Sequence, residues 1–122
     1  MPTVLIVEDE WVIADALTAA LTDAGYRVLT AANGRIALER LSELRPDVIL
    51  LDFMMPIMNG AATLDAINAN PEFRDIPVIF MTSLAESRVA EQATGFRGFL
   101  GKPFSASRVL ETVATVLASR AP

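Results

Sequence analysis

Charged residues stand directly after three of the most apolar runs in this chain. They are Glu8 and Asp9 after residues 3–7, Asp52 after residues 48–51, and Lys102 after residues 98–101. If these runs are buried parallel strands, their carboxyl ends meet at one edge of the sheet, where open α/β sheets bind ligands. We therefore expect three carboxylates and one ammonium group to share one crevice.

Asp52 is the candidate nucleophile of this crevice. A carboxylate at the exposed end of a buried strand can attack phosphorus, because carboxylates accept phosphoryl groups to give aspartyl phosphates. Taken alone, Asp52 also fits a solvated charge that merely ends a strand.

Glu8 and Asp9 add two more acids at the end of a neighbouring strand. Each would repel Asp52 by about 4 kcal/mol at a separation of about 4 Å and an effective dielectric constant near 20. Such crowding calls for a counter-ion, and Mg²⁺ is suited because it prefers one or two carboxylates, waters and phosphate oxygens. The alternative is an acidic helix start that complements the helix macrodipole.

Thr82 and Lys102 complete the group of candidate residues. Thr82 ends the fourth apolar run as Asp52 ends the third, so its hydroxyl is expected in the same crevice. Lys102 would neutralise phosphoryl oxygens in a largely electrostatic transfer reaction. A structural ion pair between Lys102 and Asp52 is the alternative, and it is compatible with that role.

Five strand patterns alternate with five helix patterns, which predicts parallel strands, right-handed crossovers and helices on both faces of the sheet. The pattern fits a single α/β domain, residues 1–122, with no linker and no effector domain. The strands are expected at residues 3–7, 27–31, 48–52, 78–82 and 97–101, and the helices at residues 10–24, 33–44, 61–69, 86–93 and 105–119. Asn33 and Ser105 are the expected helix caps, and Gly25 is the expected stop.

Composition excludes several classes of function. A net charge of −5 argues against binding to a nucleic acid backbone, which needs a basic face. The absence of histidine and cysteine excludes a Ser-His-Asp triad, a His-ligated zinc site and disulfides. No apolar run reaches the length of about 18 residues that spans a bilayer, and no signal peptide is recognisable, so we expect a cytoplasmic protein without a membrane partner.

Four motifs in combination resemble the receiver domain of the two-component response regulator family over essentially the whole chain. They are Val7-Glu8-Asp9-Glu10, the loop from Leu51-Asp52 to Asn59-Gly60, Met81-Thr82-Ser83, and Phe99-Leu100-Gly101-Lys102-Pro103-Phe104. The resemblance implies a flavodoxin-like, doubly wound sheet of five parallel strands in the order 2-1-3-4-5, an order for which a chemotaxis receiver is a known example. The chain resembles a stand-alone receiver domain in particular.

The resemblance also implies roles for the site residues. Asp52 would take a phosphoryl group from a sensor histidine kinase or a histidine phosphotransfer protein. Asp9, Asp52 and the backbone carbonyl of Met54 would hold Mg²⁺, with Glu8 assisting through water. The chain would thus catalyse its own phosphorylation and dephosphorylation while acting mainly as a signalling switch for a protein target.

The remaining implied features concern switching. Lys102 and Thr82 would contact the phosphoryl oxygens, and Lys102-Pro103 would be a cis peptide. When Thr82 moves to the phosphoryl group, the ring of Phe99 would fill its place, and this would shift the face formed by the fourth helix, fifth strand and fifth helix.

One stretch and three single residues depart from the family or lack an obvious role. The stretch between Thr82 and Lys102 is short, so we expect a truncated fourth helix. Met54 and Leu84 offer no acid or amide to orient an attacking water, which predicts slow autodephosphorylation. Trp11, the single tryptophan, is expected to pack against the domain, with a partner contact as the alternative.

Two other functions compete with this interpretation. A phosphatase or phosphotransferase of the haloacid dehalogenase type also combines a nucleophilic aspartate with a hydroxyl, a lysine and metal-binding acids. However, Met54 stands where that class has its second aspartate, and Asp52 ends the third strand instead of the first. A receiver-like interaction module that works without phosphorylation is the other alternative.

Overall fold

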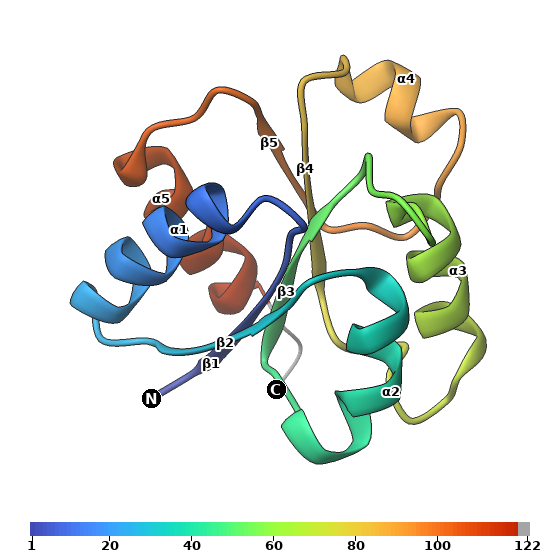
Figure 1. Cartoon of the computed structure of the whole chain (residues 1–122), viewed down its shortest axis with the longest axis horizontal. Helices are drawn as coiled ribbons and strands as arrows, with labels where there is room; N and C mark the ends of the chain where they lie inside the picture. Colours follow the sequence, from blue (N-terminus) through green and yellow to red (C-terminus); the bar gives the residue numbers. More distant parts are fainter. Residues whose placement is uncertain (120–122) are drawn as a thin grey trace.

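A five-stranded parallel sheet forms the centre of the protein. In the computed structural model, which describes residues 1–119, the strands are β1 (Thr3–Val7), β2 (Arg27–Ala31), β3 (Val48–Asp52), β4 (Val78–Thr82) and β5 (Gly98–Gly101). Their order in the sheet is β2-β1-β3-β4-β5, and all four pairings are parallel (Figure 1). The predicted doubly wound order is therefore confirmed.

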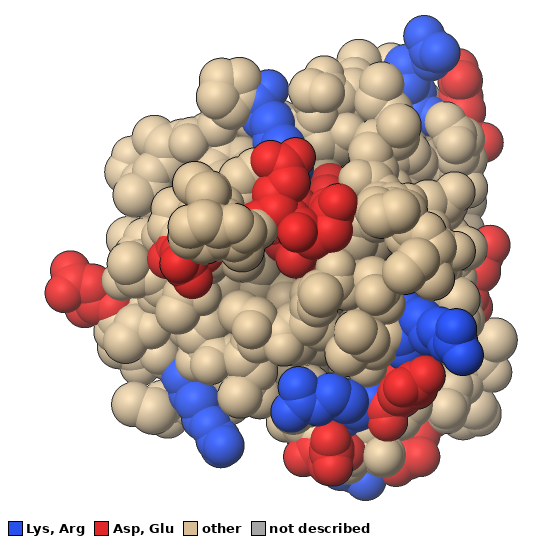
Figure 2. Space-filling view, viewed as in Figure 1, with Lys and Arg blue, Asp and Glu red and all other residues tan. Residues whose placement is uncertain are grey.

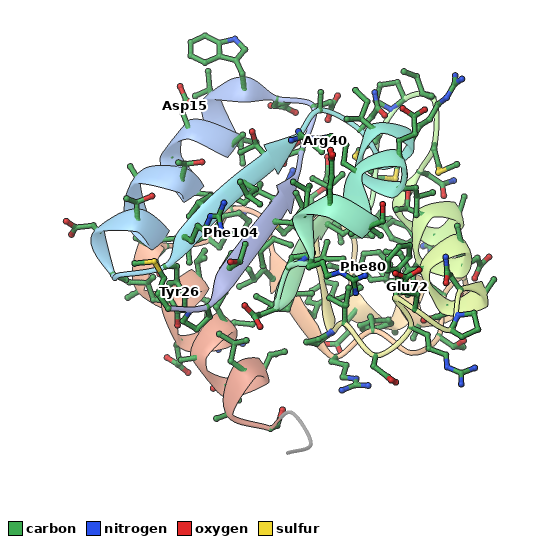
Figure 3. The ribbon with its side chains drawn as sticks, turned by 90° about the horizontal axis from the view of Figure 1, so that it is seen from below. Asp15, Tyr26, Arg40, Glu72, Phe80 and Phe104 are labelled. Atoms are coloured by element: carbon green, nitrogen blue, oxygen red, sulfur yellow. The ribbon has the colours of Figure 1, made fainter. Side chains whose placement is uncertain are left out.

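Five helices cover the two faces of the sheet. They are α1 (Trp11–Asp23), α2 (Gly34–Leu44), α3 (Gly60–Ala69), α4 (Glu86–Ala90) and α5 (Ala106–Ala118). Helices α1 and α5 pack on one face, and α2, α3 and α4 lie on the other (Figure 1). Figure 3 shows Phe80 on the side of α2, with Tyr26 and Phe104 on the side of α1 and α5.

Burial on both faces explains why the central strands are continuous apolar runs. Every residue of β3 and β4 is buried, whereas β2, at the edge of the sheet, has exposed and half-buried members. Central strands of a parallel sheet have no solvent face, so they cannot alternate polar and apolar residues.

The expected helix boundaries agree with the local hydrogen bonds. The side chains of Asn33 and Ser105 accept bonds from the backbone N–H groups of Ile36 and Arg108, which confirms both predicted caps. Gly25 follows α1 with a φ of 98°, a conformation that glycine adopts without strain.

Helix α4 is the shortest of the five helices. It spans five residues, which confirms the predicted truncation, but the expected end at Ala93 was three residues too late. The chain turns after Ala90 and reaches Gly95, whose φ is 87°. Ala93 is buried although it lies outside the helix, so its apolar character reflected packing and not helical periodicity.

The expectation that Trp11 packs against the domain was wrong. Its side chain is 73% exposed. Trp11 is the first residue of α1, one turn before Ala14, the first α1 residue that is buried. Helical spacing thus places Trp11 on the same side of α1 as the buried residues, but this side contacts the sheet only from Ala14 onward.

None of the described helices is both long enough and apolar enough to cross a membrane.

Candidate active site

Three carboxylates meet at the carboxyl ends of β1 and β3. One oxygen from each of Glu8, Asp9 and Asp52 lies within 4.8 Å of the others. The two strands are neighbours in the sheet, with Val7 paired to Leu51, so the residues that follow them are brought together. Glu8 and Asp52 are buried, whereas Asp9 is exposed. Figure 2 shows acidic side chains gathered near the middle of the view, with basic atoms directly above them and mostly uncharged surface to the left and right.

Lys102 reaches this cluster from the loop after β5. Its Nζ donates to Glu8 Oε1 at 3.0 Å and to Asp52 Oδ1 at 3.4 Å. The backbone N–H of Lys102 donates to the carbonyl of Thr82 at 2.7 Å, and the Lys102-Pro103 peptide is cis, as predicted. The expected Lys102–Asp52 pair is therefore present, beside a shorter pair with Glu8 that the sequence did not indicate.

The electrostatic surroundings of Asp52 favour its neutral form. Burial raises the pKa of its carboxyl, the hydrogen bond and charge of Glu8 raise it further, and Lys102 offsets part of this, which leaves the pKa at about 7. A carboxylate set with this much mutual repulsion is short of positive charge. A hard divalent cation would supply it.

Lys102 is held in its charged form. Burial by itself would lower the pKa of its ammonium group, but the hydrogen bond to Glu8 and the charges of Asp52 and Glu8 outweigh burial and raise the pKa above its usual range. The lysine is therefore a permanent cation beside Asp52 at neutral pH.

Thr82 ends β4 beside the crevice and is buried. Its Oγ1 accepts a hydrogen bond from the N–H of Leu84 at 3.2 Å, so the hydroxyl is engaged by its own loop. Phe99 lies on β5 opposite Phe80, half-buried against the core on the α2 and α3 face. Its predicted part in switching stays a prediction.

The loop that follows Asp52 is fixed by close packing against α3. The N–H of Gly60 donates to the carbonyl of Phe53 at 2.8 Å, and a side chain at Gly60 would meet the Phe53 Cα at 2.7 Å and the Asp52 carbonyl oxygen at 2.8 Å. Only glycine lets α3 start this close to Asp52. Within the loop, the N–H of Met54 approaches Asp52 Oδ1 at 3.4 Å, and the Met54 side chain is 62% exposed.

An apolar hollow lies beside the crevice, not in it. It is an apolar groove of about 500 Å³ between α1 and α5, and one end reaches Ser83 and Lys102. The groove itself holds no carboxylate. The candidate carboxylates therefore lie in the open acidic cluster and not in the groove. Sequence patterns gave no sign of the groove, because it depends on how two helices pack.

A five-stranded sheet of this order, with a lysine-paired acidic cluster at its carboxyl edge, defines the receiver class of signalling domains. Residues 4–114 match the response regulator receiver domain family, and the chain belongs to this family. It is a receiver domain of the kind found in two-component response regulators.

Individual relatives agree with this assignment. The transcriptional regulatory protein PrrA of Mycobacterium tuberculosis is 34% identical over 121 residues, which cover 98% of this chain and 51% of PrrA. The chain thus spans about half the length of the curated relatives it matches.

Solved structures give the same result for the fold. The signal receiver domain of a histidine kinase from Syntrophus aciditrophicus superposes with a TM-score of 0.90 at 33% identity, covering 100% of this chain and 96% of that one. The receiver domain of sensor histidine kinase PA1611 from Pseudomonas aeruginosa has a TM-score of 0.89 at 29% identity, covering 97% and 98%. That structure has a magnesium ion coordinated in its active site cleft.

Proposed function

We propose that this chain accepts a phosphoryl group on Asp52 from the phosphohistidine of a sensor histidine kinase or a histidine phosphotransfer protein. The observation that carries the proposal is the position of Asp52. It is a buried carboxylate at the end of β3, it lies 3.4 Å from Lys102 Nζ, and it belongs to an acidic cluster suited to a cation. Membership of the receiver family supports the same chemistry.

The transfer requires Asp52 to react as a carboxylate. One of its oxygens forms a bond to phosphorus while the bond from phosphorus to the imidazole nitrogen breaks, and the imidazole keeps the electron pair and takes a proton from water. Lys102, the cation beside Asp52 Oδ1, would face the oxygens of the phosphoryl group during the transfer.

The donor set fits Mg²⁺, because its side-chain members are carboxylates and every donor is an oxygen atom. Asp9, Asp52 and the backbone carbonyl of Met54 would hold the ion, and Glu8 would assist through water. When bound, the ion supplies positive charge that offsets both the carboxylates and the phosphoryl oxygens. Glu8 would also have a second role, because its ion pair with Lys102 holds the lysine beside Asp52.

Thr82 and Phe99 would couple phosphorylation of Asp52 to a change at the protein surface. A phosphoryl group on Asp52 offers oxygen acceptors to the Thr82 hydroxyl, which would leave its bond with Leu84. The ring of Phe99 would then occupy the vacated space, and the face formed by α4, β5 and α5 would change.

Phosphorylation by acetyl phosphate or phosphoramidate in Mg²⁺ tests the proposal, with intact mass as the readout. The wild type should gain one phosphoryl group, and Asp52→Asn should gain none. An unchanged wild-type mass would contradict the proposal and favour an interaction module that works without phosphorylation.

The lifetime of the phosphorylated form should be long. Met54 and Leu84 flank Asp52 and Thr82 in sequence and carry no group that orients water. Decay of phosphorylated protein in Mg²⁺ should be faster in Met54→Asn and in Leu84→Glu than in the wild type. Equal decay rates in all three would contradict this expectation.

For the output, we propose contact with a protein target and not with nucleic acid. The chain has a net charge of −5, and residues 1–26 and 46–73 contain no lysine or arginine. Because the chain matches only about half of PrrA, the output of PrrA is not assigned to these residues.

A further inference from the structure

The apolar groove between α1 and α5 has the size of a small-molecule site. The two helices lie side by side on one face of the sheet (Figure 1). The groove volume of about 500 Å³ falls within the range of roughly 300–1,000 Å³ that such sites occupy. Leu17 of α1 and Val109 of α5 line the groove and are only 3% and 1% exposed, so they form its floor. A molecule in the groove would therefore rest against the core.

Small side chains keep the groove open. Ala16 and Ala20 line it from α1, and Ala106 lines it from α5. Larger apolar side chains at these positions would fill the hollow and bury more apolar surface, which normally stabilises a fold. The open groove thus gives the fold no stability, and an exposed apolar hollow of this kind is typical of a binding site.

One end of the groove offers hydrogen-bond donors. It is lined by Ser83, which follows the last residue of β4, and by Lys102, in the loop after β5. The Lys102 ammonium group has three protons, of which Glu8 and Asp52 accept two. The third proton and the Ser83 hydroxyl can each meet an acceptor. A ligand that suits this end would therefore place an oxygen atom there.

The charges near that end disfavour an ionised ligand. Glu8, Asp9 and Asp52 form the acidic cluster to which Lys102 is paired, and they would repel an anion. A cation would face the Lys102 ammonium group, and none of the described residues that line the groove offers it a carboxylate. An uncharged acceptor, such as a hydroxyl, carbonyl or ether oxygen, meets neither obstacle.

We propose that this groove binds an uncharged amphipathic small molecule, with a mainly hydrocarbon body between α1 and α5 and a hydrogen-bond acceptor toward Ser83 and Lys102. The ligand and phosphoryl oxygens on Asp52 would compete for the protons of Lys102. Binding in the groove and phosphorylation should therefore oppose each other. This link, unlike the binding site itself, rests on the proposed function.

Octanol, octanoate and octylammonium are the probes, because they share one hydrocarbon chain and differ in the charge of the head group. Each is titrated below its micelle concentration into the isotopically labelled chain, and amide chemical shifts of groove residues give the Kd. Ala16→Leu and Ala106→Leu fill the groove from opposite walls. Ala19→Leu is the matched control, because Ala19 is also an exposed alanine of α1 but does not line the groove. The same spectra show whether each variant is folded.

We expect octanol to bind the wild type saturably and about ten-fold more tightly than either charged probe, since an ionised head loses hydration without gaining a partner. Ala16→Leu and Ala106→Leu should each weaken octanol binding about ten-fold, the effect of displacing about two methylene groups of the probe. Ala19→Leu should keep the wild-type Kd.

Three results would overturn the binding site: no saturable shifts at the groove with octanol, equal affinity in the wild type and both filled variants, or octanoate binding as tight as that of octanol. Self-association of the wild type that Ala16→Leu abolishes would overturn it as well, because the groove would then hold a second copy of the chain.

The link to Asp52 has its own measurement. Saturating octanol should slow labelling of the wild type by acetyl phosphate about five-fold and leave the rate of Ala16→Leu unchanged. An unslowed wild type would overturn the link alone. A wild type that acetyl phosphate does not label even without octanol would instead overturn the proposed function.

Discussion

At the amino-terminal edge of the sheet Asp47 and Glu72 each have a close partner, whereas at the carboxyl-terminal edge three carboxylates crowd together beside one lysine. Near the start of β1, Asp47 Oδ2 accepts a hydrogen bond from the Thr3 N–H at 2.7 Å. Arg45 and Glu72 pair at 2.8 Å on the same edge. At the opposite edge, burial and repulsion raise the pKa of Asp52 to about 7.

The two edges also differ in backbone strain, which is explained by a helix cap at the amino-terminal edge but not at the carboxyl-terminal edge. Arg45 and Ile57 are the two described residues other than glycine with positive φ. Arg45 ends α2 as its cap, with its N–H bonded to the Leu41 carbonyl, so its left-handed conformation completes a helix. Ile57 completes no such motif. The contrast indicates that one edge serves stability and the other serves function, and four substitutions test that division.

Removal of the lysine should have the largest effect. Lys102→Met should slow phosphorylation of Asp52 by acetyl phosphate by about 100-fold, because a positioned cation is worth about 3 kcal/mol to developing charge in a site of this kind. Phosphorylation is followed by intact mass. Arg45→Met, the matched change at the other edge, should leave the rate unchanged, and equal rates in both variants would contradict the division.

Asp52→Asn should stabilise the metal-free protein. The folded-state pKa of Asp52 lies above the ordinary value of 3.8, so between about pH 4 and pH 7 the folded state binds more protons than the unfolded state. The free energy of unfolding of the wild type therefore falls as pH rises through this window.

The amide that replaces the carboxyl in Asp52→Asn does not titrate, so this pH dependence should disappear in the variant. At pH 8 in EDTA, we expect the free energy of unfolding of Asp52→Asn to exceed that of the wild type by about 2 kcal/mol. This is less than the full pKa shift would give, because water in the open crevice screens the charges. Urea unfolding at pH 5 and pH 8 measures both quantities. A variant with the same pH slope as the wild type would refute the expectation.

Asp47→Ala should show the reverse behaviour. Its loss leaves the Thr3 N–H without its carboxylate acceptor, which should lower the free energy of unfolding by about 1.5 kcal/mol. The phosphorylation rate should stay at the wild-type value, because Asp47 precedes β3 and Asp52 ends it. Urea unfolding and labelling with acetyl phosphate check the two halves of this prediction. A slower rate would show that the two edges are coupled.

Ile57→Asn should give the smallest effect on stability. Asparagine tolerates the left-handed region better than isoleucine, so the free energy of unfolding should rise by about 0.5 kcal/mol. Thermal and urea unfolding of the two proteins side by side would detect it. A clear loss of stability would mean that the Ile57 side chain supports the fold.

Sequence patterns predicted the sheet because its central strands are buried on both faces. Residues 48–52 and 78–82 leave no alternative to a buried strand, and the charges that follow the apolar runs marked the edge where the site lies. The caps at Asn33 and Ser105 were equally readable, since each is a local bond between neighbours in sequence.

Features that depend on three-dimensional packing were not predicted. The pair between Glu8 and Lys102 joins residues 94 positions apart, and its geometry depends on the path of the loop after β5. Trp11 carries the spacing of a buried residue, but packing of α1 starts at Ala14. The end of α4 was misplaced because Ala93 is buried by a turn and not by a helix.

The bonds of Lys102 also connect several strands of the sheet mechanically. Its backbone N–H is bonded to the end of β4, while its side chain is bonded to residues that follow β1 and end β3. A single residue thus connects the carboxyl ends of β1, β3 and β4, in addition to the hydrogen bonds of the sheet. If a new ligand on Asp52 draws the ammonium group, the end of β4 and the loop before α5 have to move with it, so a local change of charge becomes a displacement of neighbouring segments at the same edge of the sheet.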